Sequence, residues 1–182
     1  MEVRLSHLDP KKCLSEDDVR FKEFRETCAR KCVLAECSDQ TQLYLMDWCM
    51  QHGFDLTKSY SGDEINPLDF GFHTTVMFST SSHCLPNINM EIGEFDLQPV
   101  KFSVLGENTP VLEVFSPKLL QLRDVYENQH DMKSSYPDYK PHISLSYNWS
   151  GSVEDFTRMP FPGGLGERLT VDRLVMSDIK EQ

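Results

Sequence analysis

A short pattern that occurs twice, at residues 72–78 and at residues 141–147, constrains this chain more than any other feature. Each copy has a histidine two positions before a serine or threonine, and then an aliphatic and an aromatic residue at matching positions. In a β-strand, alternate side chains share a face. The pattern therefore predicts two strands that each carry an imidazole and a hydroxyl on one face, made of His73, Thr75 and Met77 in the first copy and of His142, Ser144 and Ser146 in the second. The apolar positions between them, and Tyr147, would lie on the opposite faces.

Two imidazoles and two hydroxyls that face one cleft suit the cleavage of a phosphate ester. Because imidazole titrates near neutral pH, a neutral ring can take a proton from an attacking hydroxyl while a protonated ring gives one to the leaving oxygen. The sequence leaves open which of His73 and His142 is the base. The hydroxyls of Thr75 and Ser144 can hydrogen-bond the non-bridging phosphate oxygens. The motifs supply too few ligands for a metal site, so we expect no metal and no other cofactor.

The length and the charge of the chain exclude some classes of partner. With 182 residues, the chain is expected to form one domain. Its formal net charge of −11 would repel long RNA or DNA, whose binding depends largely on the neutralisation of phosphates. A small phosphate compound needs only local donors in a pocket, so such a ligand is compatible with this charge.

The sequence contains no apolar stretch of transmembrane length, and no secretory h-region follows Met1. We therefore expect no membrane association and a cytoplasmic location. In that compartment the six cysteines are expected to be reduced and mostly buried thiols. Their spacing does not match that of a zinc knuckle.

Two helices are expected before the first motif. Ser15 and the acidic residues after it predict the start of a helix that runs to about Cys28. After a short strand over residues 32–37, Asp39 is the expected N-cap of a helix over residues 40–52. The apolar stripe of this second helix would consist of Leu43, Met46 and Met50.

Two loops are expected to lead into the two motif strands. The first, residues 54–70, contains Tyr60, a candidate for stacking on a nucleobase. The second, residues 131–140, ends at Lys140, whose charge can counter that of a phosphate. Residues 80–90 are polar and include a proline, and they are expected to form a further loop.

The remaining segments complete an α+β pattern. Residues 94–105 and 111–115 predict a hairpin, and Ser116 followed by proline predicts a helix that reaches about Gln129. A closing strand is expected over residues 169–176. Each half then has a helix before its motif strand, which indicates a weak internal duplication of two α+β lobes around a pseudo-twofold axis.

The paired motifs resemble those of the 2H phosphoesterase superfamily. Within it, the chain is most similar to the phage anti-CBASS phosphodiesterases, which destroy the cyclic oligonucleotide alarm signals of bacterial immunity. Three segments carry this closer resemblance, namely residues 72–79, 111–119 and 139–147. Ser144 stands where the family often has threonine, and residues 170–182 match poorly.

This resemblance implies an α+β, bilobed 2H phosphoesterase-like fold with two antiparallel sheets flanked by helices around a central cleft. Residues 1–30 would be an N-terminal extension or helix. Residues 31–182 would form a single bilobed phosphodiesterase domain.

The resemblance also implies a metal-independent enzyme that cuts the 3′–5′ bonds of cyclic di- or trinucleotides, with the ribose 2′-hydroxyl as nucleophile. Its partner would be a small cyclic nucleotide, met in the cytoplasm of the bacterial host if the protein is phage-encoded. The implied catalytic residues are His73, Thr75, His142 and Ser144, and the candidates for substrate contacts are Tyr60, Lys140 and Tyr147.

Two alternatives stay open on the sequence. Another 2H enzyme, acting on nucleoside 2′,3′-cyclic phosphates or on 2′–5′ oligoadenylate, would have the same motif residues. A protein that sequesters cyclic nucleotides without cutting them would not need paired proton-transfer groups.

Overall fold

The computed structural model describes residues 26–162 and 167–179, so most of the helix predicted from Ser15 lies outside the described residues. The strands are β1 (Glu26–Cys37), β2 (His73–Pro86), β3 (Ile88–Asp96), β4 (Gln98–Leu105), β5 (Thr109–Phe115), β6 (His142–Ser144) and β7 (Thr170–Asp178). The helices are α2 (Asp39–Gln51), α3 (Pro117–Asp124) and α4 (Val153–Thr157), with a 3-10 turn, η2 (Pro67–Asp69), and a π-helical turn, η3 (Val125–Gln129).

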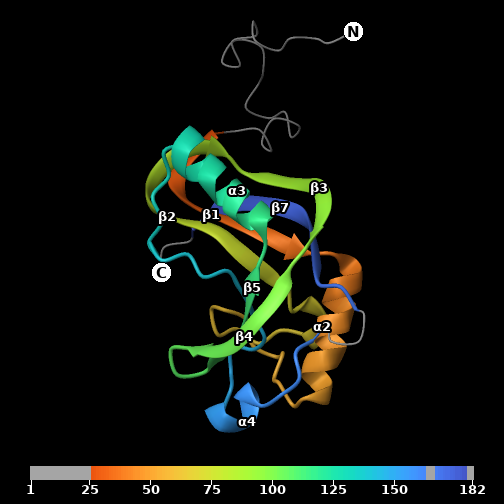
Figure 1. Ribbon diagram of the computed structural model, residues 1–182. Coiled ribbons are helices and arrows are strands. Elements are labelled where there is room, and N and C mark those ends of the chain that lie inside the picture. Colours follow the sequence, from red (N-terminus) through yellow and green to blue (C-terminus); the bar gives the residue numbers. More distant parts are fainter. Residues whose placement is uncertain (1–25, 163–166, 180–182) are drawn as a thin grey trace, which may run out of the picture.

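The seven described strands form one antiparallel sheet in the order β3-β7-β1-β2-β6-β5-β4. The mixed helix-and-sheet class is confirmed, but the two separate sheets that were predicted are joined into one. The junction lies between the motif strands β2 and β6, which pair at Thr74 and Ile143. Figure 1 shows α3 crossing the sheet, with α2 and α4 toward the other end of the molecule.

Strands β1 and β2 form a longer antiparallel pair than the sequence predicts. The polar segment 80–86 continues β2 and residues 88–90 begin β3, so the predicted loop over residues 80–90 is wrong at every position but Asn87. Cys28 lies in β1 rather than on a helix, directly opposite Cys84 of β2, and the two form a disulfide. The prediction that the cysteines are all reduced thiols is therefore wrong for this pair. Local sequence patterns could not indicate this bridge, because it joins residues 56 positions apart.

The other described cysteines are free thiols, at Cys32, Cys37 and Cys49. Burial raises the pKa of Cys32 to about 11 and that of Cys37 to about 12, the latter with a further contribution from the carboxylate of Glu36. Burial likewise raises the pKa of Cys49. Because the thiolate is the reactive form, these three side chains behave as packing residues.

Helix α2 begins one residue earlier than predicted and buries a different face. Its N-cap is Ser38, whose hydroxyl accepts a hydrogen bond from the Thr41 amide, and not Asp39. The predicted apolar stripe is wrong, since Leu43 and Met50 are exposed. The residues that face the core are Thr41, Leu45, Trp48 and Cys49. The stripe was placed on methionine and leucine alone, whereas the buried face also uses a threonine and a cysteine.

The later local signals are confirmed. Strands β4 and β5 form the predicted hairpin, with Gly106 at a positive φ of 59° in its turn, although residues 94–96 belong to β3 and not to this hairpin. Ser116 caps α3 through the Lys118 amide, and a proline fills the first helical position. No helix within the described part of the chain is long and apolar enough to cross a membrane.

Candidate active site

The pairing of β2 with β6 brings the two motifs together. Thr74 and Ile143 are opposite each other, and the antiparallel register then makes His73 a neighbour of Ser144 and Thr75 a neighbour of His142. Thr74 and Ile143 are fully buried, while all four motif side chains are half-buried. The two imidazoles and two hydroxyls therefore share the more open face of the sheet, arranged about a pseudo-twofold axis through the Thr74–Ile143 pair.

Both imidazoles are held in the same way by the backbone two residues upstream. Nδ1 of His73 lies 3.0 Å from the carbonyl oxygen of Gly71, and Nδ1 of His142 lies 2.8 Å from that of Lys140. Because a carbonyl only accepts hydrogen bonds, Nδ1 carries a proton in each ring. Nε2 is then the atom of each histidine that gains and loses a proton.

The environment of His73 favours its neutral form. Burial lowers the pKa of His73 below its usual value, and the charge of His142 lowers it further, while the hydrogen bond to Gly71 acts in the opposite direction. Desolvation disfavours the imidazolium, and two positive rings repel each other. The influence of His142 on His73 agrees with the placement of both rings on one face.

A β-bulge follows the first motif. Leu34 of β1 pairs with Thr75, but Val33 pairs with Met77, so Val76 is the extra residue on β2. Val76 and Met77 are both fully buried. The prediction that Met77 shares a face with His73 is therefore wrong, because the bulge reverses the alternation of side chains after Thr75.

The second motif strand ends earlier than predicted, and this moves Ser146 and Tyr147. The strand stops at Ser144, and Ser146 is fully buried, where its hydroxyl donates to the carbonyl oxygen of Asp55 at 2.6 Å. Ser146 is thus not on the face of His142. Tyr147 lies near the motif side chains, because its hydroxyl shares a hydrogen bond with the Ser144 hydroxyl. Burial raises the pKa of Tyr147, and this hydrogen bond lowers it. Tyr147 consequently lies beside the Ser144 hydroxyl instead of on the opposite face of the strand.

The other candidate substrate contacts differ in their placement. Tyr60 is 79% exposed, and its ring meets that of Tyr147 edge-on, with 5.8 Å between the centroids. The ring of Phe70 lies 5.5 Å from Tyr147 on another side. The loop therefore brings Tyr60 to the site. The backbone carbonyl of Lys140 contacts the site, because it bonds to the His142 ring. The Lys140 side chain is exposed to solvent.

Several residues around the motifs were missed by the sequence analysis. Gln42 of α2 brackets Phe72, because its side-chain amide donates to the Phe72 carbonyl at 2.7 Å and its oxygen accepts from the Phe72 amide at 2.7 Å. Arg123 of α3 is buried and bonds to both motif regions. A signal for Arg123 exists in the sequence, because it follows the buried Leu119 by four residues and so falls on the apolar face of its helix.

A glutamate also lies opposite each motif histidine. Glu36 of β1 pairs with His73, and Glu113 of β5 pairs with His142. Residues directly opposite in an antiparallel pair share a face, so each imidazole has a carboxylate on its outer side. Glu113 accepts a hydrogen bond from Ser103 at 3.3 Å and lies 3.6 Å from the ammonium of Lys101.

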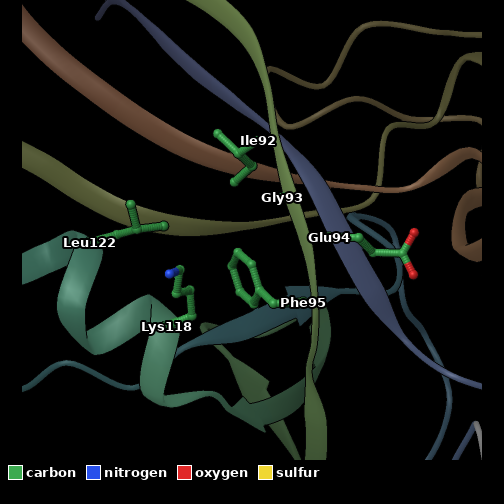
Figure 2. Close-up of a pocket in the computed structure, with 6 residues that line it drawn as sticks. All are labelled: Ile92, Gly93, Glu94, Phe95, Lys118 and Leu122. Carbon is green, nitrogen blue, oxygen red and sulfur yellow. The ribbon is translucent and has the colours of Figure 1, made fainter.

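Two cavities lie away from the four motif side chains. One, of about 390 Å³, opens between β3 and α3, where Lys118 and Leu122 face Phe95 and Ile92 (Figure 2). The other, of about 270 Å³, lies between α2 and the segment of η2 that ends at Gly71, the residue that anchors His73. Among the described residues, no group of three or more His, Cys, Asp or Glu is placed to hold a metal ion.

The sequence and the fold have counterparts among known proteins. The sequence model of the family described as "Anti-CBASS protein Acb1" matches residues 33–164, more than half of the chain. The structure is similar to that of apo LigT from E. coli, with a TM-score of 0.53 and 16% identity over 82% of this chain and 86% of LigT. It is also similar to E. coli LigT in complex with 3′-AMP, with a TM-score of 0.50 and 12% identity over 82% of this chain and 87% of LigT. LigT is a member of the 2H phosphoesterase superfamily, and at these identities the likeness concerns the fold. No curated protein matches the chain in sequence.

Proposed function

Since the chain belongs to the anti-CBASS protein Acb1 family, we propose that it cleaves cyclic di- or trinucleotide signals of bacterial immunity at their 3′–5′ bonds. The family and the LigT-like fold support a phosphodiesterase role. The observation that carries the proposal is the Thr74–Ile143 pairing, because it gathers two imidazoles and two hydroxyls on one open face. Such a set can act on the two sides of one phosphate.

In the proposed reaction, His73 is the base and His142 is the acid. The lowered pKa of His73 keeps its Nε2 free of a proton near neutral pH, so this atom can take the proton of the ribose 2′-hydroxyl. The 2′-oxygen attacks the neighbouring phosphorus, and the bond from phosphorus to the 5′-oxygen breaks. His142 gives its Nε2 proton to that leaving oxygen. The products are a linear oligonucleotide and, at its end, a 2′,3′-cyclic phosphate, which water then opens to a 3′-phosphate with the two histidines in exchanged roles.

The hydroxyls and aromatic rings complete the proposed site. Thr75 and Ser144 donate to the non-bridging oxygens, where charge grows in the transition state. The exposed ring of Tyr60 and the neighbouring ring of Tyr147 offer a stacking surface for a nucleobase. Lys140 adds positive charge near the phosphates. The reaction needs no metal ion, and its place would be the cytoplasm of a bacterial host.

One experiment tests this function directly. The protein is incubated with cyclic dinucleotides and trinucleotides in excess chelator, and the products are separated by chromatography and identified by mass. We expect a linear product with a 2′,3′-cyclic phosphate or a 3′-phosphate, and no cleavage of an analogue that lacks the 2′-hydroxyl. Cleavage of that analogue at the normal rate would show that water attacks, and activity restored only by a divalent ion would indicate a metal enzyme.

A second candidate function is the opening of nucleoside 2′,3′-cyclic phosphates or the cutting of 2′–5′ oligoadenylate. The crystal structure of E. coli LigT with 3′-AMP favours it, because 3′-AMP is a nucleoside 3′-phosphate bound to a protein of similar fold. The same panel, extended with these substrates, separates the two functions by which substrate has the higher kcat/KM. Tight binding of every cyclic nucleotide with full recovery of intact ligand would instead indicate a protein that only sequesters them.

A further inference from the structure

Arg123, on helix α3, bonds to both motif regions. The side chain of this α3 residue is 9% exposed, and its Nη1 donates to the carbonyl oxygen of Val76 at 3.1 Å. Its Nη2 donates to the carbonyl oxygen of Tyr136 at 3.1 Å, in the segment that leads to His142. Its Nε donates to Glu127 at 3.0 Å, which fixes the direction of the guanidinium. One planar, charged group thus bonds to the bulge of the first motif and to the approach of the second.

Tyr139 lies on the same guanidinium and bonds to the same strand. The Arg123 guanidinium carbon is 4.3 Å from the centroid of the Tyr139 ring, and the Tyr139 hydroxyl donates to the carbonyl oxygen of Thr75 at 3.0 Å. Burial raises the pKa of this hydroxyl, so it stays a donor at every pH at which an enzyme of this kind works. Tyr139 immediately precedes Lys140, whose carbonyl holds His142.

The two side chains bond where the regular strand pairing is interrupted. Thr75 and Val76 have consecutive carbonyl groups at the β-bulge, where the ladder between β1 and β2 shifts register. Backbone bonds between residues 78–80 and 133–135 already hold the start of the loop against β2. From there to His142, however, β6 meets β2 through the single pair Thr74–Ile143. Arg123 and Tyr139 therefore span the part of the interface that the backbone holds least.

From these contacts we propose that Arg123 and Tyr139 are positioning residues that set the spacing of His73 and Thr75 against His142 and Ser144. The proposal rests on the proposed function, because it assigns these residues to the same reaction. Neither side chain acts on the phosphate. They act through the Thr75 and Val76 carbonyls and through the loop that ends at His142, so their loss would misplace reacting groups while the core stays packed.

Two variants test the proposal. Tyr139→Phe removes one hydroxyl and leaves its ring under the guanidinium, and Arg123→Lys keeps the charge but cannot bond in two directions at once. We expect kcat to fall about tenfold in the first and about a hundredfold in the second, with KM changed by less than about twofold, because misplaced groups lose rate more than binding. Matched controls are Tyr126→Phe, which removes a buried phenol hydroxyl beyond α3, and Arg168→Lys, an exposed residue paired with Asp96.

A second measurement separates positioning from a general loss of structure. The imidazole nitrogens of His73 are titrated by NMR in each variant, alongside thermal unfolding. In Tyr139→Phe we expect the pKa of His73 to move up toward its ordinary value, because a looser interface between β2 and β6 leaves the ring less buried and farther from the charge of His142, while Tm stays within a few degrees of wild type. The controls should leave both the titration and kcat unchanged.

The outcomes distinguish the possible failures. If Tyr139→Phe has a wild-type kcat and a wild-type His73 titration, the positioning role is wrong. If its activity falls only in proportion to the fraction of unfolded protein, the role is merely structural and the proposal is again wrong. If wild-type protein opens no nucleotide, the proposed function has failed, and an unchanged His73 titration would reject the positioning role on its own. Arg123→Lys counts only if it folds, and Tyr139→Phe decides the matter without it.

Discussion

The two motif strands carry the same groups in unequal surroundings. Each histidine donates from Nδ1 to the carbonyl two residues upstream, at 3.0 Å for His73 and 2.8 Å for His142. The first lies on β2, a strand of 14 residues that pairs with the long strand β1. The second lies on β6, which has three residues and ends at Ser144. The chemical groups are duplicated, but the support around them is not.

This difference has a chemical consequence. Burial and the charge of His142 lower the pKa of His73, which favours the neutral form of that ring. On the other side, the early end of β6 lets Tyr147 return and share a hydrogen bond with Ser144. The motif on β2 therefore supplies an imidazole whose neutral form is favoured, and the motif on β6 supplies a hydroxyl that has a second hydroxyl beside it. Unequal surroundings of this kind can give the two copies of a duplicated motif different tasks.

Removing either imidazole should have the largest effect. We expect His73→Ala and His142→Ala each to lower kcat by at least about a thousandfold, since each removes a proton-transfer group. His130→Ala, which removes an exposed histidine, is the matched control and should keep wild-type activity. Product formation by chromatography and unfolding by circular dichroism check both rate and fold. Ring opening at a near-wild-type rate in either motif variant would remove the basis for the two-histidine mechanism.

The hydroxyls should respond less and unequally. Thr75→Val keeps the shape of the side chain but removes a donor, and we expect kcat to fall about a hundredfold. Ser144→Ala should cost less, about tenfold, because the Tyr147 hydroxyl stands beside Ser144 and can donate in its place. A double-mutant cycle of Ser144→Ala with Tyr147→Phe measures this. If the two changes simply add, Tyr147 does not substitute for Ser144.

The parts of this site that could be predicted are those with local signals. The paired motifs identified all four half-buried groups on the open face, because spacing within a short strand depends only on backbone geometry. The Ser116 cap and the β4–β5 turn were predictable for the same reason. The sheet junction is different, since the pairing of Thr74 with Ile143 joins residues that no local pattern connects.

The errors arise where distant segments decide the outcome. The bulge at Val76 is defined by register against β1, and it alone reverses the facing of Met77. The end of β6 is fixed by Ser146, whose hydroxyl bonds to Asp55 in a distant loop. The Cys28–Cys84 bridge likewise depends on how far the pairing of β1 with β2 extends. Arg123 is the exception, because its place on the apolar face of a helix was visible in the sequence.

The pH dependence of the reaction should show the lowered pKa of His73. Because the pKa of His73 is lowered, the acid limb of kcat/KM should fall below pH 6.5, as the base is lost only when pH drops through this lowered value. The folded state also binds fewer protons at His73 than the unfolded state does, so stability should decrease as pH falls below about 6.5. In His142→Gln, which lacks the second positive ring, the pKa of His73 measured by NMR titration should rise. An unchanged pKa would mean that the two rings do not influence each other.

The smallest effect on activity is expected from removal of the disulfide, which links β1 to β2, the strand of the first motif, and does not touch β6. Cys28 and Cys84 are both exposed and lie at the opposite end of the β1–β2 pair from His73, which pairs with Glu36. Closing a loop of 56 residues stabilises a fold by roughly 2–4 kcal/mol. Cys28→Ser combined with Cys84→Ser should therefore lower Tm by several degrees but change kcat by less than about twofold. Wild-type protein in dithiothreitol should behave in the same way, as it must if the enzyme is to work in a reducing cytoplasm. A large loss of kcat at a temperature where the variant is folded would contradict this expectation. It would show that the position of His73 depends on the disulfide at the opposite end of the β1–β2 pair.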